Sequence, residues 1–285
     1  LVQWYECDII EEYVESLKDA INAYNGEVIV HFHVTTNQDL EKCTSKEKHQ
    51  ECLNKIETIL SDFEYVCMSN TLHTIADYRR EFNDNYCEEV DVLIWGESDA
   101  ILPKQMFVIL DNLHQQSIKI NNPKYLAFFD SPKDFKPDHW WSLRYTMSKK
   151  EMNEINNKTE DLDVITLPKH KFNGCGLVIS SEVIRSGVNI PKSVFFTHED
   201  TSFMLMTNKV LGHIPQYIIK NILLVHNRKH PNKRKYVRGE IGDTMQSQRE
   251  SNDWYSKAHS MSEKNCYNIF NPNYKPYTWD DVFKN

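Results

Sequence analysis

The strongest constraint on the fold is an alternation of strand-like and helix-like segments along the first half of the chain. Residues 27–34 and 90–95 are rich in β-branched and aromatic residues, a composition typical of strands. Residues 8–23, 46–63 and 72–82 instead carry apolar side chains at helical spacing. Strands that alternate with helices form parallel sheets covered by helices, because a parallel connection needs a crossover. The sequence therefore predicts an α/β fold with a mainly parallel, mixed sheet flanked by helices.

The same alternation continues to residue 226. Further strands are expected at 65–68, 176–179 and 217–226, and further helices at 103–115, 181–186 and 201–210. Residues 121–169 are richer in Pro, Asp, Lys and Trp and are expected to be irregular. After residue 226 the chain turns basic and then polar, without the apolar pattern of a second core. We therefore expect one catalytic-type domain over residues 1–226, with a basic segment and extension over 227–285 packed on it.

Composition narrows the class of protein. The chain has 285 residues, of which 40% are hydrophobic and 26% charged, and this mixture excludes disordered and collagen-like chains. Lysine and arginine number 33 against 41 for aspartate and glutamate, which gives a net charge of −8. The surface as a whole should therefore not attract a polyanion. The longest nearly apolar run, 217–225, is far shorter than the roughly 20 residues of a membrane helix, so no membrane span is expected.

The seven cysteines are odd in number and include no CxxC pair. This pattern argues against a disulfide scaffold or a structural zinc site. We expect buried thiols in a reducing compartment, hence a cytoplasmic protein, in the host cytoplasm if the source is viral.

Two carboxylates follow the apolar strand predicted at 90–95. Glu97 and Asp99 are two residues apart, and in extended backbone this spacing points both side chains to one side. Ligands bind at the carboxyl ends of strands in open α/β sheets, and Mg²⁺ or Mn²⁺ takes carboxylate oxygens. The pattern favours a metal–diphosphate site. The alternative is a solvated turn that carries two surface acids.

A second acidic pair and a late histidine are further candidates. A carboxylate of Glu199 or Asp200, before a predicted helix, can take a proton from an acceptor hydroxyl, or the two acids can simply favour the helix N-terminus. His226 ends an apolar strand, where an imidazole is either a metal ligand or structural. The basic run behind it either holds phosphates or forms a solvated loop: it contains Arg228, Lys229, Lys233, Arg234, Lys235 and Arg238.

In their order along the chain, these features resemble the GT-A type nucleotide-sugar glycosyltransferases, most of all the family-2-like inverting enzymes. Glu97-Ser98-Asp99 resembles the family's acid-x-acid motif, with Glu in place of the usual first Asp. Glu199-Asp200 resembles its Glu-Asp motif. Residues 173–180 resemble its glycine-bearing strand on the acceptor side, and residues 5–17 the loop and helix that follow its first strand. The resemblance covers most of residues 1–226 and implies a GT-A, Rossmann-like fold.

The resemblance implies a metal-dependent transfer of a sugar from a nucleoside-diphosphate sugar to an acceptor hydroxyl, with inversion. A UDP-sugar is the favoured donor and Mn²⁺ or Mg²⁺ the cofactor. Asp99, Glu97 and His226 would hold the metal, and Asp200, with Glu199 beside it, would be the base. Donor contacts are expected from Glu97, Ser98, Asp99, Arg79, Arg80, Thr35 and Trp95. A surface-helix position is the alternative for the two arginines.

The sequence departs from the family at two points. Thr35-Thr36-Asn37 stands where many members have an Asp-Asp-Gly-Ser stretch that holds the nucleobase. No QxxRW signature follows Glu199-Asp200, which argues against a processive polysaccharide synthase.

Acceptor contacts are expected from Trp140, Trp141, Arg228, Lys229 and Lys233, with packing as the alternative for the two tryptophans. The Trp-Gly-acid-x-Asp-x-x-x-Pro pattern, which ends at Pro103, resembles bacteriophage glycosyltransferases, some of which modify hydroxymethylated cytosine in DNA. Such a base is one acceptor hypothesis and requires that the base be accessible. A glycan or lipid-linked acceptor is the competing hypothesis. A non-catalytic α/β nucleotide-binding module and metal-dependent hydrolysis of a nucleotide sugar stay open as other functions.

Overall fold

Strands form the centre of the fold in the computed structural model, which describes residues 1–38, 42–130, 147–158, 161–167, 174–227, 230–237 and 253–284. A parallel sheet contains, in order, β1 (Val2–Gln3), β2 (His31–Thr35) and β3 (Tyr65–Ser69). A larger sheet contains, in order, β4 (Val92–Trp95), β8 (Leu177–Ser180), β6 (Leu126–Asp130), β9 (Gln216–Leu223) and β7 (Val164–Leu167). Beside them, β5 (Ala100–Ile101) pairs with β10 (Val225–His226).

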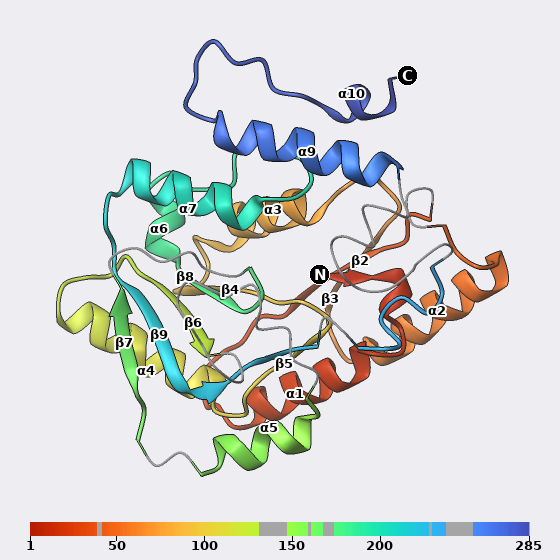
Figure 1. Ribbon diagram of the computed structural model, residues 1–285. Coiled ribbons are helices and arrows are strands. Elements are labelled where there is room, and N and C mark those ends of the chain that lie inside the picture. Colours follow the sequence, from red (N-terminus) through yellow and green to blue (C-terminus); the bar gives the residue numbers. More distant parts are fainter. Residues whose placement is uncertain are drawn as a thin grey trace.

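Helices cover both faces of these sheets (Figure 1). On one face lie α1 (Ile10–Asn22), α4 (Met106–Lys119) and α5 (Lys149–Asn156). On the other lie α3 (Ile75–Tyr86), α6 (Ser181–Arg185) and α7 (Glu199–Val210). A short 3₁₀ helix, η1 (Trp4–Glu6), and α1 both contact α2 (Lys46–Ile59). The C-terminal helix α9 (Asp253–Tyr267) lies along α7, and α10 (Trp279–Phe283) packs on α9.

The α/β fold with a mixed sheet flanked by helices, predicted from the sequence, is confirmed, but the strand pairs are not mainly parallel, because β7, β8 and β10 pair antiparallel with their neighbours. Parallel pairs join β1 to β2, β2 to β3 and β6 to β9, whereas β8 pairs antiparallel with β4 and β6, and β7 with β9. Both β6 and β7 lie in the stretch that the sequence predicted to be irregular. Both are short runs of apolar, aromatic or β-branched residues within a stretch rich in Pro, Asp and Lys, and pairing with β9, and for β6 also with β8, makes them strands.

The two largest clusters of the core lie on opposite faces of the larger sheet, because successive strand side chains point to opposite faces. In β6, Ala127 and Phe129 join a cluster with residues of α1 and α4. Leu126 and Phe128 join a second cluster with Phe203 of α7 and residues of α3 and α6. Burial on both faces explains why the strands leading to the candidate site are apolar almost throughout.

None of the helices in the described ranges has the length and apolar character needed to cross a bilayer. No disulfide joins the seven cysteines, all of which lie in the described ranges. Only Cys67 among them is exposed.

Candidate active site

Backbone pairing brings the acidic turn after β4 next to His226. The pairing of β5 with β10 sets Ala100 opposite His226, and Asn227 N donates a hydrogen bond to Asp99 O at 2.7 Å. The segment after Trp95 is a turn, not the extended backbone that the sequence suggested, with Ala100 N donating to Glu97 O at 3.0 Å. The tertiary pairing, rather than the two-residue spacing alone, therefore directs Glu97 and Asp99 to one place.

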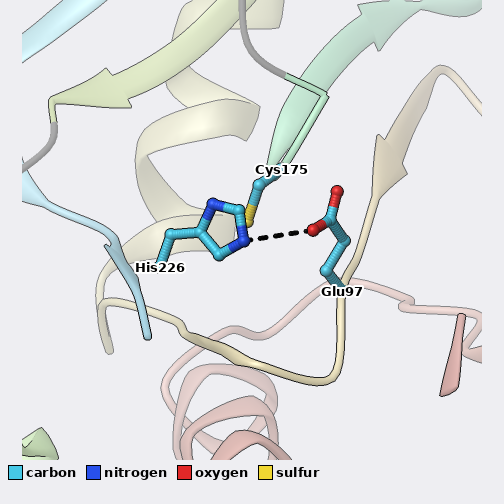
Figure 2. Close-up of side chains that lie close together, drawn as sticks. All are labelled: Glu97, Cys175 and His226. Carbon is cyan, nitrogen blue, oxygen red and sulfur yellow. Dashed lines mark ion pairs between the residues drawn. The ribbon is translucent and has the colours of Figure 1, made fainter. Parts of the chain in front are cut away.

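Both carboxylates reach the same imidazole nitrogen. His226 Nε2 lies 3.2 Å from Glu97 Oε2 and 3.2 Å from Asp99 Oδ2; Figure 2 shows the ion pair with Glu97. Burial lowers the pKa of His226, but the charges and hydrogen bonds of Asp99 and Cys175 together outweigh it and hold this pKa well above its ordinary value. Burial likewise disfavours ionised Asp99 and Glu97, yet His226 and the neighbouring cations hold the pKa of both carboxyls below the ordinary range. The site thus stabilises an imidazolium between two carboxylates.

Cys175 is a site residue that the sequence analysis missed. Its Sγ, one Glu97 oxygen and one His226 nitrogen all lie within 4.8 Å of one another (Figure 2). Cys175 directly precedes Gly176, whose N–H donates to Trp95 O at 2.8 Å, so the pairing of β8 with β4 carries the thiol into the site. Burial raises the pKa of this thiol. In the sequence it looked like any core cysteine before an apolar strand.

A buried arginine connects this cluster to the second acidic pair. Arg79 donates from Nη2 to Glu97 Oε1 at 2.5 Å and to Gly174 O at 3.0 Å, and from Nη1 to Glu199 Oε1 at 2.6 Å. Its guanidinium also lies over the Trp95 ring, 4.7 Å from the centroid. A Cβ at Gly174 would approach Nη1 to 2.3 Å, so a side chain there would displace the guanidinium from this position. Glu97 and Glu199 are therefore held by the two ends of one guanidinium.

Lys233 was predicted as an acceptor or phosphate contact. It lies instead in the acidic cluster, which consists of Glu97, Asp99 and His226 together with the nearby Glu6. Its Nζ is 2.5 Å from Asp99 Oδ2 and 3.4 Å from Glu6 Oε1. The Ser98 hydroxyl donates to the same Glu6 carboxylate. Because Asp99 and Glu6 are both buried, an unpaired charge there would be costly, and Lys233 supplies the compensating cation.

Three predicted donor contacts have other partners. Arg80 follows Arg79 on α3, about 100° further round the helix, and donates to the carbonyls of Ile190, Pro191 and Val194. Trp95 is a core residue whose Nε1 donates to Asn83 Oδ1 at 2.9 Å. Thr35, at the end of β2, donates to Gln3 Oε1 at 2.9 Å. Of these three side chains, only Trp95 is linked to the cluster of Glu97, Asp99 and His226, because its ring lies under the Arg79 guanidinium.

The structure describes only some of the residues that were predicted to contact the acceptor. The predicted contacts and basic residues outside the described part of the chain are Trp140, Trp141, Arg228, Lys229 and Arg238. Of the remaining basic run, Arg234 lies over the Tyr5 ring at 5.1 Å, and Lys235 Nζ is 3.3 Å from Asp8 Oδ2. These two cations pack against the acidic N-terminal segment rather than forming an open track for phosphates.

Glu199 and Asp200 begin α7, but their side chains have different surroundings. Glu199 is buried and bound to Arg79. Asp200 is half-buried, and its Oδ1 accepts from Thr201 N at 2.6 Å. Burial, followed by the nearby Asp200 charge, raises the pKa of Glu199 to about 7 in spite of Arg79. The half-buried Asp200 is therefore the more accessible carboxylate of the pair.

Glu199→Gln is expected to change how stability depends on pH. With a native pKa of about 7 against an ordinary value of 4.5, the folded protein binds more protons than the unfolded chain between these pH values. Its stability therefore falls as pH rises through this window. From pH 5 to pH 8 the wild type should lose roughly 2 kcal/mol relative to Glu199→Gln. Urea unfolding at the two pH values measures this difference, and parallel pH profiles would contradict the assignment.

A cavity of about 300 Å³ lies next to this cluster, between the edges of β2 and β4. Two runs of consecutive residues line its walls: 27–33, which leads into β2, and 90–97, which contains β4. Residues of α1, α3 and α4 also line it. Consecutive residues line a wall when a strand edge, with its backbone N–H and C=O groups, faces it. Glu97 and Arg79 are among its lining residues, and both also belong to the cluster that follows β4. We therefore place the candidate site at the carboxyl end of β4 rather than inside the cavity.

No protein-family profile matches the chain, and no curated protein is similar to it in sequence. A comparison with solved structures finds the crystal structure of S. aureus TarS, residues 1–349, with a TM-score of 0.44 and 9% sequence identity. The match covers 96% of this chain, which spans 66% of the TarS chain. The likeness is distant, and no property of TarS is carried over to this chain.

Proposed function

We propose that the protein is a metal-dependent glycosyltransferase that moves a sugar from a nucleoside-diphosphate sugar to an acceptor hydroxyl, with inversion. The observation that carries this proposal is the convergence of Glu97, Asp99 and His226 just after β4. Strand ends of this kind are where α/β sheets bind ligands. The order of motifs along the sequence, which resembles GT-A enzymes, supports the same function and favours a UDP-sugar as the donor.

The side chains of the cluster fit a divalent metal. Two carboxylates and one imidazole suit Mn²⁺ better than Mg²⁺, because Mg²⁺ prefers an all-oxygen shell. Glu97, Asp99 and His226 would hold the ion, and bound there it would offset the negative charge that develops on the departing nucleoside diphosphate. His226 must first lose its proton, and Lys233 must release Asp99. Metal binding should therefore release protons and strengthen as pH rises.

Asp200 is the proposed base. It is half-buried at the start of α7, whereas the Glu199 carboxylate is occupied by Arg79 at 2.6 Å. A base must reach the acceptor hydroxyl in the bound complex, and the accessible carboxylate meets this requirement better. Glu199 is a positioning residue, because it acts through Arg79 on Glu97.

The acceptor is proposed only as a hydroxyl-bearing molecule. Lys233, Arg234 and Lys235 face acidic or aromatic groups of the chain itself. Cations engaged in this way release few counterions from a nucleic acid. For the described cations of the basic run, this observation favours a glycan or lipid-linked acceptor over hydroxymethylated DNA, and both belong in the test.

A transfer assay tests the proposed function. Purified protein is incubated with Mn²⁺ and radiolabelled UDP- and GDP-sugars, together with glycan, lipid-linked and hydroxymethylated-DNA acceptors. We expect labelled product with one donor, lost when EDTA is added, and an inverted anomeric configuration by NMR. Release of free sugar without product would indicate a hydrolase. No turnover of any donor would contradict the proposal.

Asp200→Asn should lower kcat for transfer by about 10²–10⁴-fold, because the amide cannot take the hydroxyl proton. Asn keeps an oxygen that can accept from Thr201 N, so the start of α7 should keep its structure. Affinity for the nucleoside diphosphate should not change, since Asp200 is not a proposed metal ligand. Initial rates and binding isotherms of both proteins measure the two effects. Transfer at the wild-type rate would show that the base is another group.

A further inference from the structure

A second group of metal-binding side chains lies apart from the acidic cluster. One ring nitrogen each of His198 and His259 and one oxygen of Glu263 all lie within 4.8 Å of one another. His198 directly precedes α7, whereas His259 and Glu263 are both on α9. Residues four apart on a helix are neighbours on its surface. Two elements far apart in the sequence thus bring three potential ligands together.

The face of α9 that carries these ligands is fixed against the turn before α7. Ser262 Oγ accepts from Phe196 N at 3.3 Å and donates to Thr197 O at 2.6 Å. One turn further along, Asn265 Nδ2 donates to Ser193 O at 2.7 Å. These hydrogen bonds set the position and rotation of α9, so His259 and Glu263 are presented to His198 by a rigid helix.

The backbone of His198 supports a special role for its side chain. His198 has φ 68° and ψ 22°, in the left-handed region, which is uncommon for residues other than glycine. Its carbonyl accepts from Ser202 N at 2.8 Å, and so begins α7. Its ring centroid lies 4.9 Å from that of His259, which is buried. Strained backbone persists where the surrounding structure imposes it, and it is common at functional sites.

We propose that His198, His259 and Glu263 form a binding site for a transition metal of the Zn²⁺ class. Two imidazoles and one carboxylate are a ligand set that Zn²⁺ takes, with water in the fourth position. Ligand atoms about 2.0–2.2 Å from the ion lie nearer to one another than 4.8 Å, so small side-chain movements close the site around it. Because none of the ligands is cysteine, the lack of a CxxC pair does not bear on this site.

The site has a structural consequence for the helix that carries Glu199 and Asp200. Bound metal would join α9 directly to His198, the residue that directly precedes α7. The imidazole-rich set also differs from the carboxylate-rich set at Glu97 and Asp99, so the two sites should prefer different ions. Neither site depends on the other.

Zinc titration of the tag-free, metal-stripped full chain tests this site, with a chromophoric competitor reporting affinity. His259→Ala and Glu263→Gln each remove one ligand. His213→Ala is the matched control, because His213 is an exposed histidine away from the cluster. His226→Gln removes the imidazole of the acidic cluster. We expect Zn²⁺ affinity at this site to fall at least about 100-fold in the first two variants. The Zn²⁺ affinity of this site should be retained in His213→Ala and His226→Gln.

A thermal melt separates binding from misfolding. Saturating Zn²⁺ should raise the Tm of the wild type and of His213→Ala, because a ligand that binds only the folded state stabilises it. The rise should be smaller in Glu263→Gln, in which, of the two clusters in the described part of the chain, only that of Glu97, Cys175 and His226 keeps all its potential ligands. This helix-surface change decides the result even where His259→Ala fails to fold. Equal Zn²⁺ affinity in the wild type and Glu263→Gln, loss only in His226→Gln, or no Zn²⁺ binding by the wild type would each overturn the proposal. None of these readouts requires transfer activity.

Discussion

Asp99→Asn is expected to lower the rate of sugar transfer at least about 1000-fold and to abolish Mn²⁺-dependent binding of a nucleoside diphosphate. The change removes one of the two carboxylates that lie 3.2 Å from His226 Nε2. It also removes the closest anion to Lys233, at 2.5 Å. Initial rates with saturating donor, and binding isotherms with and without Mn²⁺, measure both effects.

A companion variant separates chemistry from folding. In Asp99→Asn the half-buried Lys233 ammonium keeps the more distant Glu6, and loss of one partner of a buried ion pair costs up to about 3–5 kcal/mol. Asp99→Asn/Lys233→Met removes both charges of that pair and should recover much of this stability. The double variant should still fail to transfer sugar. Wild-type transfer by either variant would exclude Asp99 as a metal ligand.

Arg79→Met should destabilise the folded protein by about 3–5 kcal/mol and abolish transfer. The change leaves Glu97 and Glu199 without the guanidinium that holds them at 2.5 and 2.6 Å. It also leaves Gly174 O without its donor at 3.0 Å. Arg79→Lys should not rescue the protein, because one ammonium cannot reproduce this fork of three hydrogen bonds.

A double-mutant cycle with Glu199→Gln tests this network. If Arg79 compensates a buried carboxylate at Glu199, the two substitutions together should cost less than the sum of their separate effects, by about 0.5–3 kcal/mol. Urea unfolding of the four proteins at pH 8 gives the coupling, because Glu199 is mostly ionised there. Additive effects, or a stable Arg79→Met protein, would contradict the proposed linkage.

Local periodicity was sufficient for much of the first half of the fold. The helix expected at 8–23 is α1 (Ile10–Asn22), and the strand expected at 90–95 contains β4 (Val92–Trp95). In contrast, α9 was not expected, because its side chains are mainly polar and its packing partners lie in α7 and the turn before it. Its place follows from tertiary contacts, which a single-sequence pattern does not contain.

The candidate site was predictable to a similar extent. The sequence identified Glu97, Asp99 and His226 as candidates, but only the pairing of β5 with β10 sets them side by side. Nothing in the adjacent pair Arg79-Arg80 distinguishes a residue of the acidic cluster from one that binds loop carbonyls. The rotation of α3 and the position of the 190–194 loop decide between them. The basic run likewise did not predict that Lys233 is the counterion of Asp99, because tertiary contacts bring these two residues together.

Calorimetric titration of UDP into the protein, with Mn²⁺ and then with EDTA, tests the central claim most directly. If Glu97, Asp99 and His226 form a metal–diphosphate site, UDP should bind at least about 100-fold more tightly with Mn²⁺, equivalent to about 2.7 kcal/mol. Asp99→Asn/Lys233→Met should lose this difference while remaining folded. Equal UDP affinity with Mn²⁺ and with EDTA, or wild-type Mn²⁺ dependence in the double variant, would contradict the account.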